Sequence, residues 1–286
     1  KLYFDENIAR DYGLTYFLTI NQDATDYVSD RINRLEEIED QEVVHANIRV
    51  ISLISGRTLV DIRNKQTVSE IMKIRTNDKS ILRPIYYAGI INSGIDLNSK
   101  LLSTEIAGRD TRTSLVSVRK LFLSGATLFD DNLSGDASTY LLEYLKGKIQ
   151  EDAITITWDE KIELNLDNII SLFTPILSDG SSPKMRYLDK IDDLNGNQIY
   201  LYKDGNNEKY LEREIAFKIK SLLCDIDKVE ISRNNKYMGS NNCVYYVQAG
   251  NKLFYLRFTG NVAFFAIVSN VNLKNEDHLI SIMDDV

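Results

Sequence analysis

The chain has 286 residues, of which 43% are hydrophobic and 27% are charged, and its formal net charge is −8. A chain of this length can bury a core without disulfides or a structural metal, in one large domain or two modest ones. Its longest apolar runs are too short to cross a membrane, and its acidic balance argues against general binding to nucleic acid or anionic lipid.

The first part of the sequence alternates strand-like and helix-like patterns. Bulky and polar residues alternate over residues 13–20, which predicts a half-buried strand. Apolar residues at steps of three and four then predict a helix over residues 21–39. Residues 43–54 and 58–62 are predicted strands that a turn at Gly56 joins.

The middle of the sequence continues this alternation. Capping-box spacing predicts a short helix over residues 67–74, and another short helix is expected at residues 99–106. Residues 81–91 and 113–123 are predicted strands, the first of them an edge strand or a bulged one because it contains Pro84. Further elements are predicted as a helix at residues 137–146, a strand at residues 153–158, and a helix at residues 166–177 that Pro175 disturbs.

The pattern changes after the polar segment 178–183, and we place a domain boundary near Gly180. Residues 1–178 then form a mixed α/β region, and residues 179–286 form a second region. The second region has a hairpin around Asn195-Gly196 and an amphipathic helix over residues 208–223. Strand-like runs follow at residues 228–232, 243–248, 252–258 and 261–268, which predict an antiparallel meander before a last short helix after Asn275. The predicted fold class is α+β.

Familiar catalytic and cofactor motifs are missing from the sequence. His45 and His278 are the only histidines, and neither has a partner at the spacing of a metal motif. We find no phosphate-binding glycine loop, no Gly-x-Ser-x-Gly and no other serine nucleophile motif. We therefore expect no cofactor and no zinc centre, and we favour a protein that is not an enzyme. A magnesium or calcium site built from oxygen ligands alone stays open, because acidic residues are plentiful.

Two polar groups remain as weak candidate sites. Asp136, Asp159 and Lys161 resemble in type the acids and lysine with which metal-dependent nucleases hold magnesium and steady a water, although Glu160 interrupts the usual spacing. Arg109 and Arg112 lie in a short segment that could bind a small anion. The common alternatives are a solvated turn for the first group and a charged connector for the second.

The predicted meander offers a candidate interface. Residues 261–268 are apolar on both faces, so Phe264 and Phe265 point to opposite sides, and we expect both rings to be shielded from water. Tyr255 and Arg257 share one face of the neighbouring strand. The cover is either the chain's own helix over residues 208–223 or a partner.

From these patterns the leading hypothesis is a non-enzymatic assembly or partner-binding protein, such as a phage or viral structural component. Its partner would be another protein or a second copy of the chain. The alternatives are a metal-dependent, nuclease-like enzyme and a regulatory module that binds a small anion. We expect Cys224 and Cys243 to be free thiols. The expected location is cytoplasmic, or the virion if the source is viral.

Overall fold

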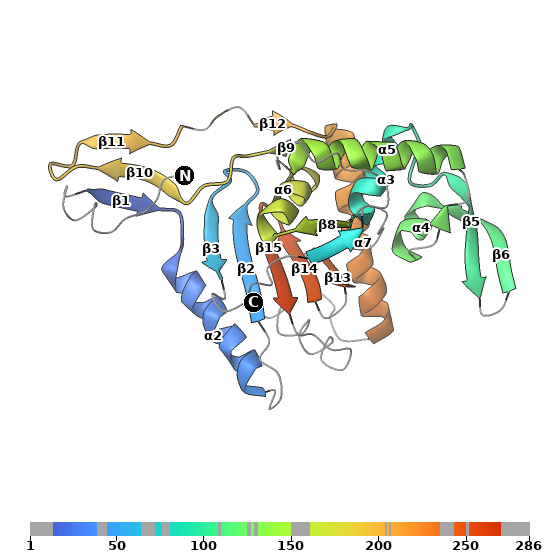
Figure 1. Ribbon diagram of the computed structural model, residues 1–286, viewed down its shortest axis with the longest axis horizontal. Helices are drawn as coiled ribbons and strands as arrows, with labels where there is room; N and C mark the ends of the chain where they lie inside the picture. Colours follow the sequence, from blue (N-terminus) through green and yellow to red (C-terminus); the bar gives the residue numbers. More distant parts are fainter. Residues whose placement is uncertain are drawn as a thin grey trace.

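The computed structural model shows an antiparallel sheet at the centre of the molecule with helices on both of its faces (Figure 1). The structure describes residues 14–38, 45–63, 72–75, 81–107, 110–124, 127–128, 131–149, 161–203, 205, 207–234, 243–249 and 252–269.

The central sheet joins the two ends of the sequence. Its strands are β2 (His45–Ser52), β3 (Thr58–Ile62), β13 (Cys243–Ala249), β14 (Lys252–Thr259) and β15 (Val262–Ser269), in the order β13-β14-β15-β2-β3. All neighbours are antiparallel, and β15 pairs with β2 along its whole length, from Val262 opposite Ser52 to Ser269 opposite His45.

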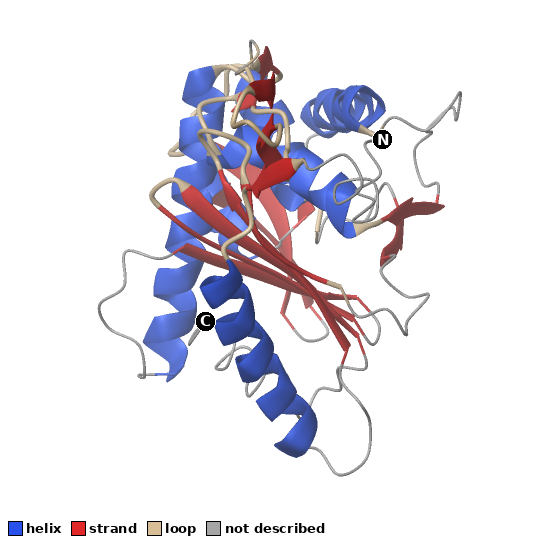
Figure 2. Cartoon of the chain, turned by 90° about the vertical axis from the view of Figure 1, so that its left-hand side faces the viewer, coloured by secondary structure: helices blue, strands red, loops and turns tan. Residues whose placement is uncertain are grey.

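The two faces of this sheet are covered by different helices (Figure 2). Phe265 lies in the main core together with α6 (Leu166–Leu177) and α7 (Arg213–Asn234). Phe264 lies in a smaller core on the other face, which includes Val28 of α2 (Gln22–Ile38). Both rings are buried, with exposed fractions of 7% for Phe264 and 0% for Phe265, as the alternation of the strand predicts.

A helical layer lies beyond α6 and α7. It contains α3 (Arg83–Asn92), α4 (Val118–Ser124) and α5 (Asp131–Lys148), and α3 packs against both α5 and α7. A Cβ atom on Gly89 of α3 would lie 2.9 Å from the Cα atom of Ala137, so the close approach of α3 to α5 requires glycine at this position.

Short strands flank this layer. The strands β4 (Met72–Arg75) and β8 (Lys161–Leu164) pair with each other, and β5 (Lys100–Ala107) pairs with β6 (Asp110–Ser117) and β7 (Thr127–Leu128).

A small outer sheet lies beside β3. It consists of β1 (Thr15–Leu18), β10 (Leu188–Asp192) and β11 (Gln198–Leu201), while β9 (Ser181–Ser182) pairs with β12 (Glu208–Lys209). The hydroxyl of Thr19 donates to the Thr58 carbonyl over 2.7 Å, and Arg57 and Asp189 form an ion pair of 2.7 Å. These contacts fasten the outer sheet to the central one.

A buried arginine connects β2 to its neighbours. The side chain of Arg49 is 5% exposed and lies 3.5 Å from the carboxylate of Asp61 on β3, and it also pairs with Asp167 at the start of α6. Burial alone would raise the pKa of Asp61, but hydrogen bonds from Arg63 and Tyr187 and the charge of Arg49 hold it below its ordinary value.

The α+β class and the C-terminal meander are therefore confirmed, whereas several single elements differ from prediction. Residues 81–91 are not a strand, because Pro84 stands in the first turn of α3, where its missing N–H is harmless. The predicted helix at residues 99–106 is replaced by strand β5, which begins at Lys100, and residues 228–232 continue α7. The segment 113–123 is divided between β6 and α4, and Met72–Arg75 is a strand.

The described residues do not test every predicted element. The predicted strand at residues 153–158 and the last helix after Asn275 lie outside the described residues. The division near Gly180 remains a prediction; the main core contains side chains from both sides of that residue.

The prediction of free cysteines is wrong. Cys224 and Cys243 form a disulfide, with Cα atoms 4.4 Å apart across a sequence separation of 19. The sequence pattern placed them on different elements, and the missing information was that α7 lies alongside β13.

Candidate active site

Helix α3 is buried along almost its whole length. Every residue from position 84 to position 91 is buried, and Arg83 is its only charged side chain. The residue that precedes the helix, Leu82, has no side-chain acceptor for the first-turn amides. The positive end of the helix dipole is therefore not neutralised by a capping side chain.

Three helices meet at the first turn of α3. The guanidinium of Arg83 donates to the carbonyl oxygen of Phe122 in α4 over 3.1 Å. The hydroxyls of Tyr86 and of Ser134 in α5 are 2.9 Å apart and share a hydrogen bond. Tyr87 packs edge-on against Phe122 at 5.2 Å, and burial raises the pKa of Tyr87 well above its usual value. These contacts hold the beginning of α3 in one position.

The sequence that leads into this turn is Ser80-Ile81-Leu82-Arg83-Pro84. Ser80 lies outside the described residues, while Ile81 and Leu82 are fully buried. A serine ahead of a helix N-terminus, with a cationic side chain three residues later, combines a hydroxyl nucleophile with positive potential for a developing oxyanion.

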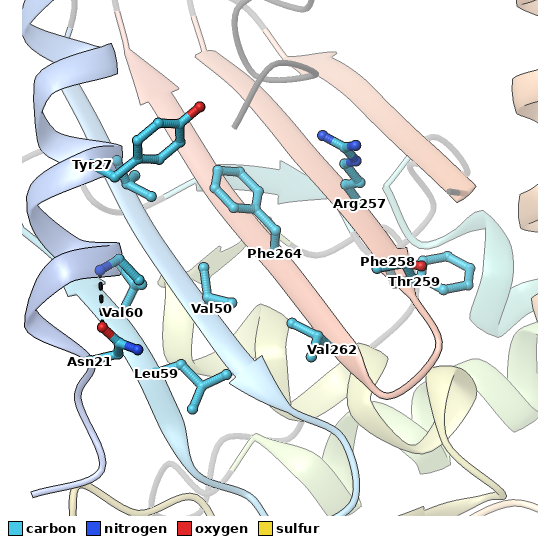
Figure 3. Close-up of a pocket in the computed structure, with 12 residues that line it drawn as sticks. Asn21, Tyr27, Val50, Leu59, Val60, Arg257, Phe258, Thr259, Val262 and Phe264 are labelled. Carbon is cyan, nitrogen blue, oxygen red and sulfur yellow. Dashed lines mark hydrogen bonds between the residues drawn. The ribbon is translucent and has the colours of Figure 1, made fainter. Parts of the chain in front are cut away.

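A separate cavity of about 380 Å³ opens between α2 and the central sheet (Figure 3). Its lining is mainly apolar and includes Tyr27, Val50, Val262 and Phe264, with Arg257 at its margin. It lies on the Phe264 face of the sheet, whereas α3 belongs to the core on the Phe265 face. The cavity is therefore not part of the α3 site.

The acids and lysine of the nuclease hypothesis do not form a described cluster. Asp136 is exposed on α5, Lys161 is exposed at the start of β8, and Asp159 lies outside the described residues. Within the described ranges, no group of three His, Cys, Asp or Glu residues could hold a metal ion. No helix in that part of the chain is long and apolar enough to cross a membrane.

The remaining predicted site residues belong to elements other than α3 or lie outside the described residues. Arg109 is outside the described residues, and Arg112 stands opposite Glu105 in the β5–β6 pair. Tyr255 is fully buried and Arg257 is half-buried, as part of the central sheet. Since Tyr255, Phe264 and Phe265 are all covered within one chain, the rings no longer argue for a partner on this sheet.

No known protein family matches the sequence, and no similar sequence is found among curated proteins. Solved structures do match. The penicillin-binding protein PonA1 from Mycobacterium tuberculosis is similar with a TM-score of 0.70 and 12% identity, over 94% of this chain and 78% of that one. The D,D-transpeptidase domain of a peptidoglycan glycosyltransferase from Eggerthella lenta gives a TM-score of 0.66 and 10% identity, over 94% and 85%.

A third similar structure is the imipenem acyl-enzyme complex of penicillin-binding protein A from M. tuberculosis, with a TM-score of 0.65 and 11% identity, over 93% of this chain and 78% of that one. These neighbours contradict the hypothesis of a non-enzymatic assembly or viral structural protein, because their fold is that of enzymes.

Penicillin-binding proteins use a serine nucleophile in the motif S-x-x-K, together with S-D-N and K-T-G. The prediction that the sequence lacks a serine nucleophile motif is therefore wrong. S-x-x-K is present at Ser117–Lys120 and at Ser181–Lys184, and Ser80–Arg83 has the same spacing with arginine in place of lysine. K-T-G does not occur anywhere in the sequence.

The structure distinguishes these three serines. Ser181 donates to the carboxylate of Asp179 and is the first residue of the two-residue strand β9, so its spacing to Lys184 is not helical. Ser117 caps the short helix α4, and Lys120 is exposed. Ser80 precedes the buried helix α3, a signal that was hidden because residues 81–91 resemble a strand in composition. The chain thus shares the fold of the penicillin-binding transpeptidase domains.

Proposed function

We propose that this chain acts on the peptides of peptidoglycan by acyl transfer, with Ser80 as the nucleophile and Arg83 as the cation beside it. The observation that carries the proposal is the transpeptidase fold over 94% of the chain, combined with a serine that leads into its buried helix α3. The similar proteins are penicillin-binding, and one of them is an acyl-enzyme complex, so penicillin is a suitable probe.

The replacement of lysine by arginine determines how fast this reaction should be. A guanidinium remains protonated in proteins, so Arg83 cannot accept the proton of the Ser80 hydroxyl. Its charge can still favour the alkoxide, and its hydrogen bond to the Phe122 carbonyl fixes its position. A general base contributes roughly 10²–10⁴-fold to such a step. We therefore expect slow acylation, and the absence of K-T-G acts in the same direction.

The test is labelling with a fluorescent penicillin, followed by intact mass measurement and peptide mapping. In the reaction the Ser80 oxygen bonds to the lactam carbonyl carbon, the lactam C–N bond breaks and the serine proton passes to the nitrogen. The expected result is a slow adduct on Ser80 that Ser80→Ala abolishes. Arg83→Lys should accelerate it by about 10²-fold, since it restores a group that can act as a base.

The matched control is Arg83→Met, which removes the charge without adding a base and should slow labelling further. The proposal fails if neither the native chain nor Arg83→Lys is labelled after prolonged incubation. It also fails if Ser80→Ala leaves the labelling unchanged.

Ser117 is the second candidate, because it has the complete S-x-x-K spacing at the start of a helix. Its hydroxyl accepts from the Lys120 amide at 3.3 Å, which is the role of a helix cap. Ser117→Ala should therefore leave labelling intact. An adduct that maps to Ser117 would transfer the proposed activity to that site.

A further inference from the structure

The floor of the cavity between α2 and the central sheet is a single row of side chains. Arg257 of β14 stands opposite Phe264 of β15. Phe264 in turn is opposite Val50 of β2, and Val50 is opposite Val60 of β3. Directly opposed residues place their side chains on the same face of a sheet, and all four line this cavity. The row therefore begins at a guanidinium and continues through three apolar side chains (Figure 3).

Helix α2 forms the wall of the cavity at the β3 end of this row. It contacts β3, and its Val28 is 4% exposed in the smaller core. Tyr27 of α2 and Val262 of β15 line the same cavity and are both partly open to solvent. The volume of about 380 Å³ is in the range of small-molecule sites. An open apolar space of this size suits the hydrocarbon part of a ligand, because binding removes both surfaces from water.

The charge at this cavity is positive, although the chain as a whole has a net charge of −8. Among the described residues that line the cavity, Arg257 alone carries a charge. Next to it along α2, the guanidinium of Arg31 lies 5.4 Å from the centroid of the Tyr27 ring and donates to the Tyr27 hydroxyl over 3.3 Å. The acidic residues in the described turns of α2 are exposed and outside the lining: Asp23, Asp26 and Asp30. The complementary ligand group is an anion, and a guanidinium pairs with a carboxylate through two parallel hydrogen bonds.

We propose that this cavity binds a fatty acid, with its carboxylate at Arg257 and its acyl chain along the row toward Val60. Three strand spacings separate the two ends of the row, about 14 Å, so the site suits an acyl chain of medium length. The site lies on the Phe264 face of the sheet, whereas α3 belongs to the core on the Phe265 face. The inference therefore does not depend on acylation at Ser80.

Calorimetric titration of the full chain with octanoate and decanoate, both below their micelle concentrations, tests this inference. One molecule should bind per chain. Decanoate should bind about fifteenfold more tightly than octanoate, because each buried methylene group contributes about a factor of four. Decanol, which has the same chain without the charge, should bind about tenfold or more weakly than decanoate.

Substitutions at the two ends of the row separate the roles of charge and space. Arg257→Met keeps the length of the side chain without its charge, and it should weaken decanoate binding about tenfold or more while the affinity for decanol stays the same. Lys252→Met is the matched control, because Lys252 is a cation of the same strand that does not line the cavity. Val50→Phe fills part of the floor and should weaken the binding of both ligands.

Four results would overturn the inference. One is the absence of saturable decanoate binding to the native chain. Another is equal affinity for decanol and decanoate, which would mean that no cation recognises the carboxylate. The third is an equal effect of Arg257→Met and Lys252→Met on decanoate binding, and the fourth is unchanged binding to Val50→Phe. The comparison of decanoate with decanol on the native chain is sufficient by itself if the variants do not fold.

Discussion

Lys148 is an amine buried at the end of α5. Lys148 is 9% exposed as a whole residue, and its Nζ atom lies 3.1 Å from the centroid of the Tyr210 ring. Burial lowers the pKa of Lys148 to about 8, against the opposing effect of the Glu208 charge. In the unfolded chain the pKa of a lysine is about 10.4. The folded chain therefore binds fewer protons than the unfolded chain between these two values.

This difference makes folding stability depend on pH with a definite sign. Because the unfolded state holds the proton more tightly, the free energy of unfolding rises as the pH increases from neutrality to about 10. For Lys148 with its pKa at about 8, the gain between about pH 7 and about pH 9 is about 1 kcal/mol. Lys148→Met removes this contribution, so the native chain should gain about 1 kcal/mol relative to the variant over that interval.

Urea unfolding at the two pH values measures this relative gain. Lys146→Met is the matched control, because Lys146 is an exposed lysine of the same helix turn, and its stability difference from the native chain should not change with pH. The reasoning is refuted if the difference between the native chain and Lys148→Met is the same at both pH values.

Three further perturbations have expected magnitudes. Arg49→Met should lower the free energy of unfolding, measured in urea, by about 2 kcal/mol. This is less than the roughly 3–5 kcal/mol typical of a broken buried pair, because Arg63 still balances the charge of Asp61. A cost near zero would mean that the pair behaves as a solvated one. Gly180→Ala should lower the melting temperature and reduce the free energy of unfolding by at least about 2 kcal/mol. The reason is that Gly180 has a φ of +92° and that a Cβ there would lie 2.2 Å from the Leu211 carbonyl oxygen. An unchanged melting temperature would contradict this. Replacing both bridged cysteines by serine should cost about 3 kcal/mol of loop-closure entropy under oxidising conditions, and equal stability would show that the bridge does not form.

Local patterns were sufficient where one period dominates the sequence. Short strand-like runs between turn residues predicted Thr58–Ile62 and the meander β13–β15, and the two-residue period of a strand assigned Phe264 and Phe265 to opposite faces. Helix α6 was predicted as far as Pro175, and the structure continues it through Pro175 to Leu177. In these elements each side chain's environment follows from its own strand or helix.

The candidate site could not be derived in this way, because its central helix α3 is buried on all sides. Helix α3 has no polar face, so its sequence lacks a helical period and resembles that of a buried strand. Pro84, which would interrupt a strand, is instead a residue of the first helical turn. The contacts of Arg83 with Phe122 and of Tyr86 with Ser134 join helices that are distant in sequence. The sequence by itself determined the α+β class and the alternating faces of the meander. Only the tertiary structure decided that Cys224 meets Cys243, that Ser80 precedes a central helix, and that the fold is that of a transpeptidase, because these depend on how the elements pack rather than on their local periodicity.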